Sequence, residues 1–169
     1  MPTDQELLDK IIDGDESALA ELYRRYYRRL ARFLLRVTRD TGLVAEVIND
    51  VFLVVWQKAT DFRGDASVSS WILGIAYRRA LKASKKTRTW EPLGSASPSD
   101  LAGEDPQNHR LELDSSLAQL SAEHRAVVEL AYFFGYSYRE IGEILECPEN
   151  TVKTRMFHAR RALGSILEV

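Results

Sequence analysis

The first half of the chain repeats its apolar residues at the three- and four-residue spacing of amphipathic helices. From Leu19 to Val37 this spacing predicts one long helix, and a second helix follows over residues 44–59. A third helix begins near Ser69 after a turn, and a short helix is expected near Asp4–Asp13. Because no segment alternates apolar and polar residues with period two, the pattern predicts an all-α fold.

The last third of the chain has the pattern of a helix-turn-helix. Ser121 is a candidate N-cap for one helix, and Gly135 is suited to close that helix in a left-handed conformation. Ser137 and Glu140 then have the spacing of a capping box at the start of a short helix. That helix ends before Pro148, and a second amphipathic helix follows. A short capped helix, a tight turn and a second helix predict a helix-turn-helix.

A stretch without apolar periodicity separates these two parts. Residues 87–112 contain three of the five prolines of the chain and are rich in glycine, serine and aspartate. A loop of this length is unusual inside one compact domain. We therefore expect two small helical domains, residues 1–86 and 113–169, joined by a flexible linker at residues 87–112. The pattern leaves open whether the two domains of the free protein tumble separately or fold together.

Charge is distributed unevenly over these parts. The net charge is -2 overall, and by segment it is +3, -3 and -2 along the chain. A uniformly basic protein that coats nucleic acid is thus excluded, but a local basic face is not. Between Asn150 and Arg161 the last helix has four basic residues and no acid, although its domain is net negative. Such a stripe indicates phosphate binding, and an ordinary solvated helix face is the plainer alternative.

Three other segments allow two interpretations each. The run Ala76–Trp90 has six basic residues, no acid and aromatic neighbours, which suits single-stranded nucleic acid but also a basic helix end. The run Arg24–Arg39 has seven arginines, which form either a solvated face or a contact with DNA backbone or an acidic surface. Residues 45–56 are apolar all round, so this helix is either central to the bundle or docks a partner.

The sequence gives little support to catalysis. The three histidines lie in different predicted elements, no metal-ligand spacing or phosphate loop is present, and we expect no cofactor and no enzyme activity. A nuclease carboxylate cluster at residues 13–16 is the weaker alternative, because these residues resemble a helix start. The single cysteine, Cys147, is expected to be a small turn residue rather than a redox sensor. The first ten residues lack a continuous apolar run, so we expect a cytoplasmic protein without stable membrane insertion.

Several residue groups in this order resemble one protein family. They are DESALAELYRRY (Asp15 to Tyr26), AEVINDVFLVVW (Ala45 to Trp56), Phe62-Arg63-Gly64, Ser70-Trp71-Ile72, the segment from Gly135 to Leu145 and the segment from Thr151 to Arg160. Each group alone is weakly specific, but their order and spacing closely resemble the extracytoplasmic-function (ECF) class of bacterial sigma-70 factors. The resemblance covers nearly the whole chain except the linker.

The resemblance implies a function in transcription initiation. Such proteins bind core RNA polymerase and select promoters, and the first domain (region 2) docks on the polymerase and opens the -10 element. The polymerase-binding positions implied here are Asn49, Asp50, Phe52, Leu53 and Trp56. The implied -10 DNA positions are Phe62, Arg63, Arg78, Arg79, Lys82, Lys85 and Lys86. Relatives often carry an asparagine where this chain has Arg78, so no -10 consensus is transferred.

The second domain (region 4) is implied to read the -35 element as duplex DNA. Lys153, Thr154 and His158 match base-facing positions of the recognition helix, and Arg155, Arg160 and Arg161 match positions suited to phosphates. The resemblance also implies an anti-sigma factor as partner and a monomeric free protein. The alternative is a helix-turn-helix regulator that binds an operator without polymerase.

Overall fold

The structure is a computed structural model that describes residues 1–88 and 115–167. Over these residues it contains helices and turns but no strand, which confirms the predicted fold class. The first unit consists of α1 (Asp4–Ile12), α2 (Glu16–Thr38), α3 (Thr41–Lys58), the 3-10 turn η1 (Ala59–Asp61) and α4 (Val68–Arg88). The second consists of α6 (Ala122–Val128), the π-helical turn η2 (Glu129–Phe133), α7 (Tyr138–Leu145) and α8 (Glu149–Leu167). The predicted linker lies outside the described residues except for its first two positions, which belong to α4.

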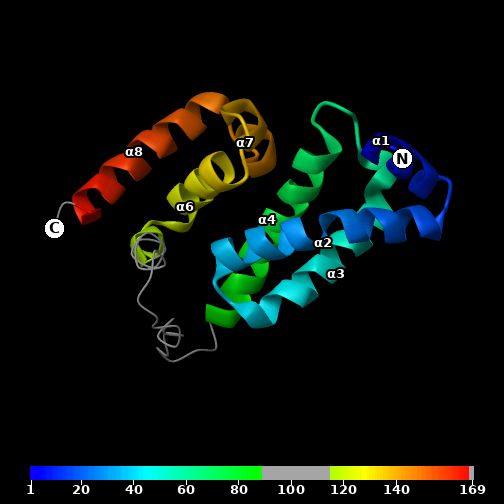
Figure 1. The fold of residues 1–169 in the computed structure, drawn as a ribbon, viewed down its shortest axis with the longest axis horizontal. Helices are drawn as coiled ribbons and strands as arrows, with labels where there is room; N and C mark the ends of the chain where they lie inside the picture. The colour runs from blue at the N-terminus through cyan, green and yellow to red at the C-terminus, as the bar shows by residue number, and fades with distance from the viewer. Residues whose placement is uncertain (89–114, 168–169) are drawn as a thin grey trace.

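Local polar side chains set where the first helices begin and end. Asp15 caps α2, because its carboxylate accepts from the backbone N–H groups of Ser17 and Ala18 at 2.9 and 3.2 Å. Helix α2 ends at Thr38, its C-cap Arg39 has a left-handed φ of 56°, and Asp40 immediately caps α3. The break between the two long helices is therefore only two residues, and it turns α3 back along α2 (Figure 1).

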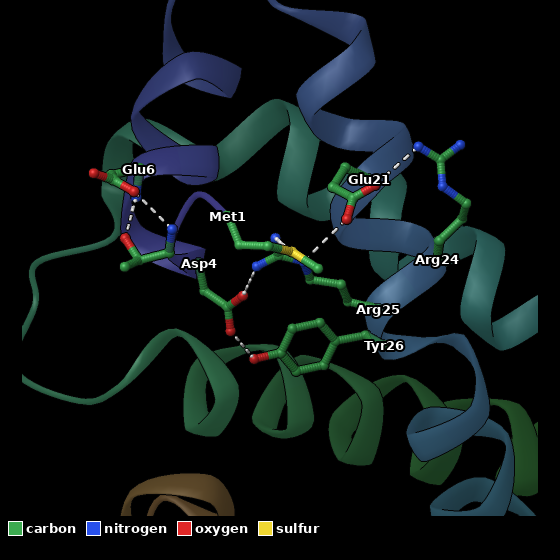
Figure 2. Close-up of polar contacts among 8 residues, drawn as sticks. Met1, Asp4, Glu6, Glu21, Arg24, Arg25 and Tyr26 are labelled. Carbon is green, nitrogen blue, oxygen red and sulfur yellow. Dashed lines mark hydrogen bonds and ion pairs between the residues drawn. The ribbon is translucent and has the colours of Figure 1, made fainter.

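Helix α1 is tied to α2 through Asp4. The Asp4 carboxylate accepts from Arg25 Nη1 at 3.1 Å and from the Tyr26 hydroxyl at 2.5 Å, as Figure 2 shows. Burial, followed by the hydrogen bond to Asp4, raises the pKa of Tyr26, so this hydroxyl stays a donor. Thr3 and Glu6 form a capping box that begins α1. The short first helix is thus held by polar contacts at its start and by apolar side chains along its inner face.

The core of the first unit lies where α2, α3 and α4 meet. Leu30, Phe33, Ile48 and Ile72 are fully buried there. Helix α3 is buried on most of its circumference, which explains why its apolar residues do not fall on a single stripe. Burying such side chains contributes roughly 1.5–3 kcal/mol each relative to leaving them exposed.

The caps predicted for the second unit are present. The Ser121 hydroxyl accepts from the backbone N–H of His124 at 3.2 Å. Ser137 and Glu140 form a reciprocal capping box at the start of α7, with bonds of 3.1 and 3.2 Å. Gly135 has a φ of +70°, which favours glycine over residues with a Cβ. Helices α7 and α8, joined by the turn at residues 146–148, form the predicted helix-turn-helix.

One segment differs from the sequence prediction. The spacing of apolar residues from Val127 to Phe134 predicts an uninterrupted α-helix, but α6 ends at Val128 and a π-helical turn follows. The Phe134 N–H donates to the Glu129 carbonyl at 3.2 Å, an i to i+5 bond. Glu129 is only 2% exposed, although it is acidic. A buried carboxylate at this place is not apparent from a helical pattern.

The two units pack directly on each other in the structure. Helix α4 lies against α7, and α2 lies against α6 and η2 (Figure 1). The contact between α4 and α7 is close, because a Cβ on Gly74 would lie 3.1 Å from the carbonyl oxygen of Ile144. Both helical units therefore form one closed molecule.

Candidate partner and nucleic-acid interfaces

Helix α3 presents a narrow exposed strip on an otherwise buried helix. Asn49 is exposed and Leu53 is 54% exposed, while Asp50 and Trp56 are half-buried beside them. The Tyr23 hydroxyl donates to Asn49 Oδ1 at 3.4 Å and fixes one end of this strip. An exposed leucine between polar side chains on a rigid helix is suited to helix-on-helix docking. We call Asn49, Asp50, Leu53 and Trp56 the α3 strip.

Phe52, which belongs to the predicted docking set, lies beneath the exposed strip rather than on its surface. It is 4% exposed and packs edge-on against the Tyr23 ring, with centroids 4.9 Å apart. The helical rotation from Leu53 turns it towards α2 rather than towards solvent. Phe52 therefore supports the α3 strip from below and is not part of its surface.

A positively charged groove of about 250 Å³ runs between α3 and α4. Trp71 lines it, and the Phe62 ring packs on Trp71 with centroids 5.2 Å apart. Four cationic side chains line the groove with one carboxylate: Lys58, Arg78, Arg79, Lys82 and Asp61. The structure thus brings together four of the predicted -10 DNA residues, namely Phe62, Arg78, Arg79 and Lys82. Cationic side chains beside an aromatic pair suit an extended nucleic-acid strand.

Three of the predicted -10 residues remain, namely Arg63, Lys85 and Lys86. Arg63 is exposed on the loop that follows η1. Lys85 and Lys86 lie on the last turns of α4, but their side chains lie outside the described part of the chain. Lys58 and Asp61 were not predicted, because both lie beyond residues 45–56, the segment predicted to dock a partner, and before the basic run that begins at Ala76. Lys58 lies one helical turn after Val54, which also lines the groove, and this spacing is the signal that could have placed Lys58 there.

Helix α8 has one buried face and one exposed polar face, as predicted. Val152, Met156 and Ala159 are buried against α6 and α7. Lys153, Thr154 and His158 are exposed on the opposite face, and the adjacent Phe157 is 57% exposed. This face is therefore accessible to a duplex even when the two units are packed together.

Comparisons with known proteins agree with this geometry. Residues 22–90 match the family model Sigma-70 region 2, and residues 110–163 match Sigma-70, region 4. The chain is 31% identical over 175 residues to the ECF RNA polymerase sigma factor SigK of Mycolicibacterium vanbaalenii, covering 96% of this chain and 88% of that protein. This chain is an ECF sigma factor of the sigma-70 family.

More distant relatives and solved structures extend the comparison. The RNA polymerase sigma-H factor of Pseudomonas aeruginosa is 26% identical over 187 residues, which cover 98% of this chain and 94% of that protein. CnrH, solved in complex with the cytosolic domain of CnrY, has a TM-score of 0.74 at 23% identity, covering 98% and 97% of the two chains. RpoE of Bartonella quintana, solved with the anti-sigma factor NepR, has a TM-score of 0.65 at 20% identity, covering 89% and 96%. These structures share the fold of the sigma factor.

The arginines of region 4 differ in what they contact. Arg155 is half-buried, with Nη2 3.7 Å from Glu123 Oε1 and Nη1 donating to Cys147 Sγ at 3.9 Å. It therefore points back towards α6, whereas the prediction placed it among the phosphate contacts. Cys147 is a half-buried turn residue that accepts this bond.

Arg160 and Arg161 lie on the exposed side of α8. Arg160 donates through Nε and Nη2 to the Tyr132 hydroxyl, at 3.1 and 2.8 Å, and this bond raises its pKa. Arg161 is exposed. The His158 ring stacks on His124, with centroids 6.1 Å apart. Of the predicted phosphate contacts, Arg160 and Arg161 reach the surface that a duplex would meet.

Two further properties of the described residues bear on the class of protein. No three His, Cys, Asp or Glu side chains within residues 1–88 and 115–167 are grouped so that they could hold a metal ion. In the same residues, every helix is too short or too polar to cross a bilayer.

Proposed function

We propose that this sigma factor binds core RNA polymerase through region 2 and directs initiation at promoters with distinct -10 and -35 elements. The observation that carries the proposal is that one chain joins a charged α3–α4 groove beside a docking helix to a capped helix-turn-helix with an exposed polar face. Family membership adds weight, because sigma factors are non-enzymatic initiation factors. The polymerase supplies the chemistry, and the sigma factor supplies the choice of site.

In region 2, the proposed division of labour follows the two faces of α3. The α3 strip docks on polymerase through the exposed Leu53 and its polar neighbours. The groove on the other side takes the melted -10 strand, where Arg79 and Lys82 would contact phosphates and the Phe62–Trp71 pair would contact bases. Polymerase docking and promoter melting would thus use opposite sides of region 2, which is assigned to residues 1–86.

In region 4, assigned to residues 113–169, α8 is proposed to enter the major groove of the -35 element. Lys153 can donate to guanine O6 or N7, and Thr154 and His158 can contact neighbouring bases. Thr154 already donates to the Asn150 carbonyl at 3.0 Å, so its oxygen is held in a fixed position. Arg160 and Arg161 would fix the register through phosphates without reading sequence.

We also propose that an anti-sigma factor regulates this monomeric protein in the bacterial cytoplasm. Two proteins with the same fold were solved in complexes of this kind or with a cytosolic partner domain. The exposed leucine of the α3 strip and the exposed Phe157 supply apolar surface that such a partner could cover.

The proposal is tested by initiation. Purified sigma factor is mixed with bacterial core RNA polymerase and fragmented DNA of its source genome, and the 5′ ends of the transcripts are sequenced. Discrete start sites that share two upstream elements are expected. If the protein binds neither polymerase nor promoters, the proposal fails, and selective operator binding without polymerase would then identify a conventional regulator.

A further inference from the structure

Tyr132 is an exposed aromatic residue of region 4 that belongs to neither of the predicted DNA-binding sets. It lies in η2 and is 61% exposed, whereas Glu129 and Leu130 of the same turn are buried. Its hydroxyl accepts from Arg160 Nε at 3.1 Å and from Arg160 Nη2 at 2.8 Å. The guanidinium carbon also lies 5.8 Å from the Tyr132 ring centroid. A tyrosine held at the surface by a cation of another helix is typical of a binding surface rather than of core packing.

The group that Arg160 contacts carries no charge. Other arginines of region 4 lie beside carboxylates, Arg155 beside Glu123 at 3.7 Å and Arg139 beside Glu143 at 3.8 Å. A carboxylate neutralises the cation that it holds, but a tyrosine hydroxyl does not. Tyr132 therefore fixes the Arg160 guanidinium in place and leaves its positive charge available to an anion.

Both members of this pair keep hydrogen-bonding capacity for a further group. A guanidinium has five N–H donors, and the Tyr132 oxygen takes one from Nε and one from Nη2. The edge formed by Nη1 and the second N–H of Nη2 thus faces away from the tyrosine. A phenol hydroxyl also has one proton to donate, and it cannot donate that proton to a guanidinium. The pair therefore offers a cationic edge and an O–H donor, which are the groups that bind phosphate oxygens.

Arg160 lies on the same side of α8 as Lys153, the predicted base-reading residue. The two are seven residues apart, which is close to two helical turns and about 10 Å along the helix axis. The exposed Phe157 lies between them on this side. The face of α8 that would enter a major groove therefore ends at the Tyr132–Arg160 pair.

Duplex DNA offers a phosphate at this distance. In helix-turn-helix complexes the first residues of the recognition helix contact base edges. The major groove is about 12 Å wide, and the phosphate backbones border it. A side chain about 10 Å beyond Lys153 along α8 thus reaches the border of the groove rather than its bases.

We propose that Tyr132 and Arg160 form a phosphate clamp at the edge of the -35 surface. Tyr132 holds the guanidinium through its oxygen and donates its hydroxyl proton to a phosphate oxygen, while Arg160 supplies the charge and the outward N–H donors. The inference rests on the proposed function for its target, the -35 duplex, but a backbone contact does not depend on base sequence. Tyr132 is then a DNA-binding residue outside the helix-turn-helix, and it joins the recognition helix to the helix before it.

The first test measures how duplex binding by the full-length protein depends on salt. A fluorescent mixed-sequence duplex of about 30 base pairs, roughly three helical turns, is titrated by anisotropy at several salt concentrations. Each phosphate that a cation neutralises contributes about 0.9 to the magnitude of the slope of log K against log salt. Tyr132→Glu places a carboxylate against Arg160, so we expect weaker binding and a slope smaller in magnitude by about one. An unchanged slope would overturn the clamp.

A milder variant separates the hydroxyl from the charge. Tyr132→Phe keeps the ring and leaves Arg160 charged, so the slope should stay near that of the wild type. Its affinity should fall about 3- to 10-fold, because a hydrogen bond is lost. Wild-type affinity in Tyr132→Phe would overturn the clamp. If Tyr132→Glu loses helical signal in circular dichroism, Tyr132→Phe alone decides.

Two substitutions elsewhere serve as matched controls. Gln119→Glu makes the same change in net charge at an exposed position before α6. Tyr27→Phe removes a phenol hydroxyl from α2, where Tyr27 is 39% exposed. Both controls should bind the duplex like the wild type. If Gln119→Glu lowered the slope as much as Tyr132→Glu, the effect would be one of net charge, and the clamp would be refuted.

A double-mutant cycle tests whether Tyr132 acts through Arg160. Arg160→Ala alone should lower the magnitude of the salt slope by about one. Adding Tyr132→Phe to Arg160→Ala should cost less affinity than Tyr132→Phe costs in the wild type, because residues that share one contact are not additive. Equal costs in the two backgrounds would show that Tyr132 does not position Arg160.

The second test locates the phosphate. In a duplex taken from a promoter mapped by initiation, each phosphate near the -35 element is replaced in turn by an uncharged methylphosphonate. One replacement is expected to weaken binding of the wild type severalfold and to leave binding of Tyr132→Glu nearly unchanged. Equal effects on both proteins at every phosphate would contradict the clamp.

The clamp and the proposed function can fail separately, because the salt test uses mixed-sequence DNA and needs no promoter. A protein that initiates from two-element promoters, but whose salt slope ignores Tyr132→Glu, would keep the function and refute the clamp. A protein whose slope responds to Tyr132→Glu, but which never initiates with core polymerase, would keep the phosphate contact and refute the proposed function.

Discussion

Region 2 and region 4 both offer a partner surface on a helix, yet they support that helix differently. In region 2, α3 packs against α2 and α4, and seven of its apolar residues are buried. In region 4, α8 buries one stripe, and its neighbours depend on side-chain caps at Ser121 and Ser137. Burial is distributed over many residues, whereas a cap is one hydrogen-bonded residue. We therefore expect region 4 to be the more easily melted half.

The largest expected effect comes from creating one cavity in each region, which tests whether region 4 melts more easily than region 2. Ile48→Ala and Ile141→Ala each remove a fully buried side chain and should cost roughly 2–5 kcal/mol. Region 4 is small and has little stability to lose. Urea denaturation followed by hydrogen exchange should show Ile141→Ala unfolding region 4 while region 2 stays protected. Simultaneous loss of protection in both regions would show that they share one folding unit.

A second pair of substitutions separates the two partner surfaces. Leu53→Asp should abolish stable polymerase binding without changing -35 duplex binding, because Leu53 is exposed and far from α8. Lys153→Ala should cost about 1–3 kcal/mol of binding to the preferred -35 sequence and leave polymerase binding unchanged. Pull-down with core polymerase and duplex titration measure the two effects. If either variant lost both polymerase binding and -35 duplex binding, the assignment of these two activities to separate regions would be wrong.

A capping box begins a helix in each region, which permits a direct comparison. Thr3→Ala on α1 and Ser137→Ala on α7 each remove the side-chain oxygen of a capping box. Each should cost about 1 kcal/mol in the free energy of unfolding. We expect Ser137→Ala also to weaken -35 binding, since α7 supports α8. Thr3→Ser and Ser137→Thr, which keep the cap, should restore most of the stability.

Acid should weaken the capped helix starts of region 2, and this is the smallest effect we expect. The Thr3 backbone N–H lowers the pKa of Glu6, and the Ser17 hydroxyl lowers the pKa of Asp15. Because folding lowers these two pKa values, the charged carboxylates stabilise the fold fully at any pH above their ordinary pKa of about 4. That stability is lost as the pH falls through the lowered pKa. Thermal melts from pH 5 to 3 should show this loss, and Glu6→Gln should reduce its slope.

Local features were predictable from the sequence, and features set by tertiary contact were not. The caps at Ser121 and Ser137 depend on residues three positions apart, so their spacing was enough. Phe52 was misplaced because a helix that is apolar all round does not show which face is buried. For the same reason the sequence did not predict the α3–α4 groove, because residues from two helices line it.

The contact between the regions was beyond prediction for a related reason. Arg36 is one of seven arginines in its run, and nothing in that run distinguishes it from the exposed Arg28 and Arg32. Glu129 is a charged residue, so the sequence alone would place it on the surface. Only the packed structure shows that these two charges meet and that Arg78 reaches Glu146.

The π-helical turn η2 has a genetic consequence. A π turn contains one residue more than the α-helix it interrupts, so deleting one residue such as Ala131 would leave a continuous helix of ordinary pitch. Because the π turn absorbs that extra residue, everything after the deletion, including Phe134 and Tyr136, would keep nearly its present orientation relative to α6. The caps that define region 4 would be retained, and the same side of it would face region 2. The loss of one codon at η2 should therefore be tolerated, whereas the loss of one inside α8 would rotate every later residue of that helix by about 100°.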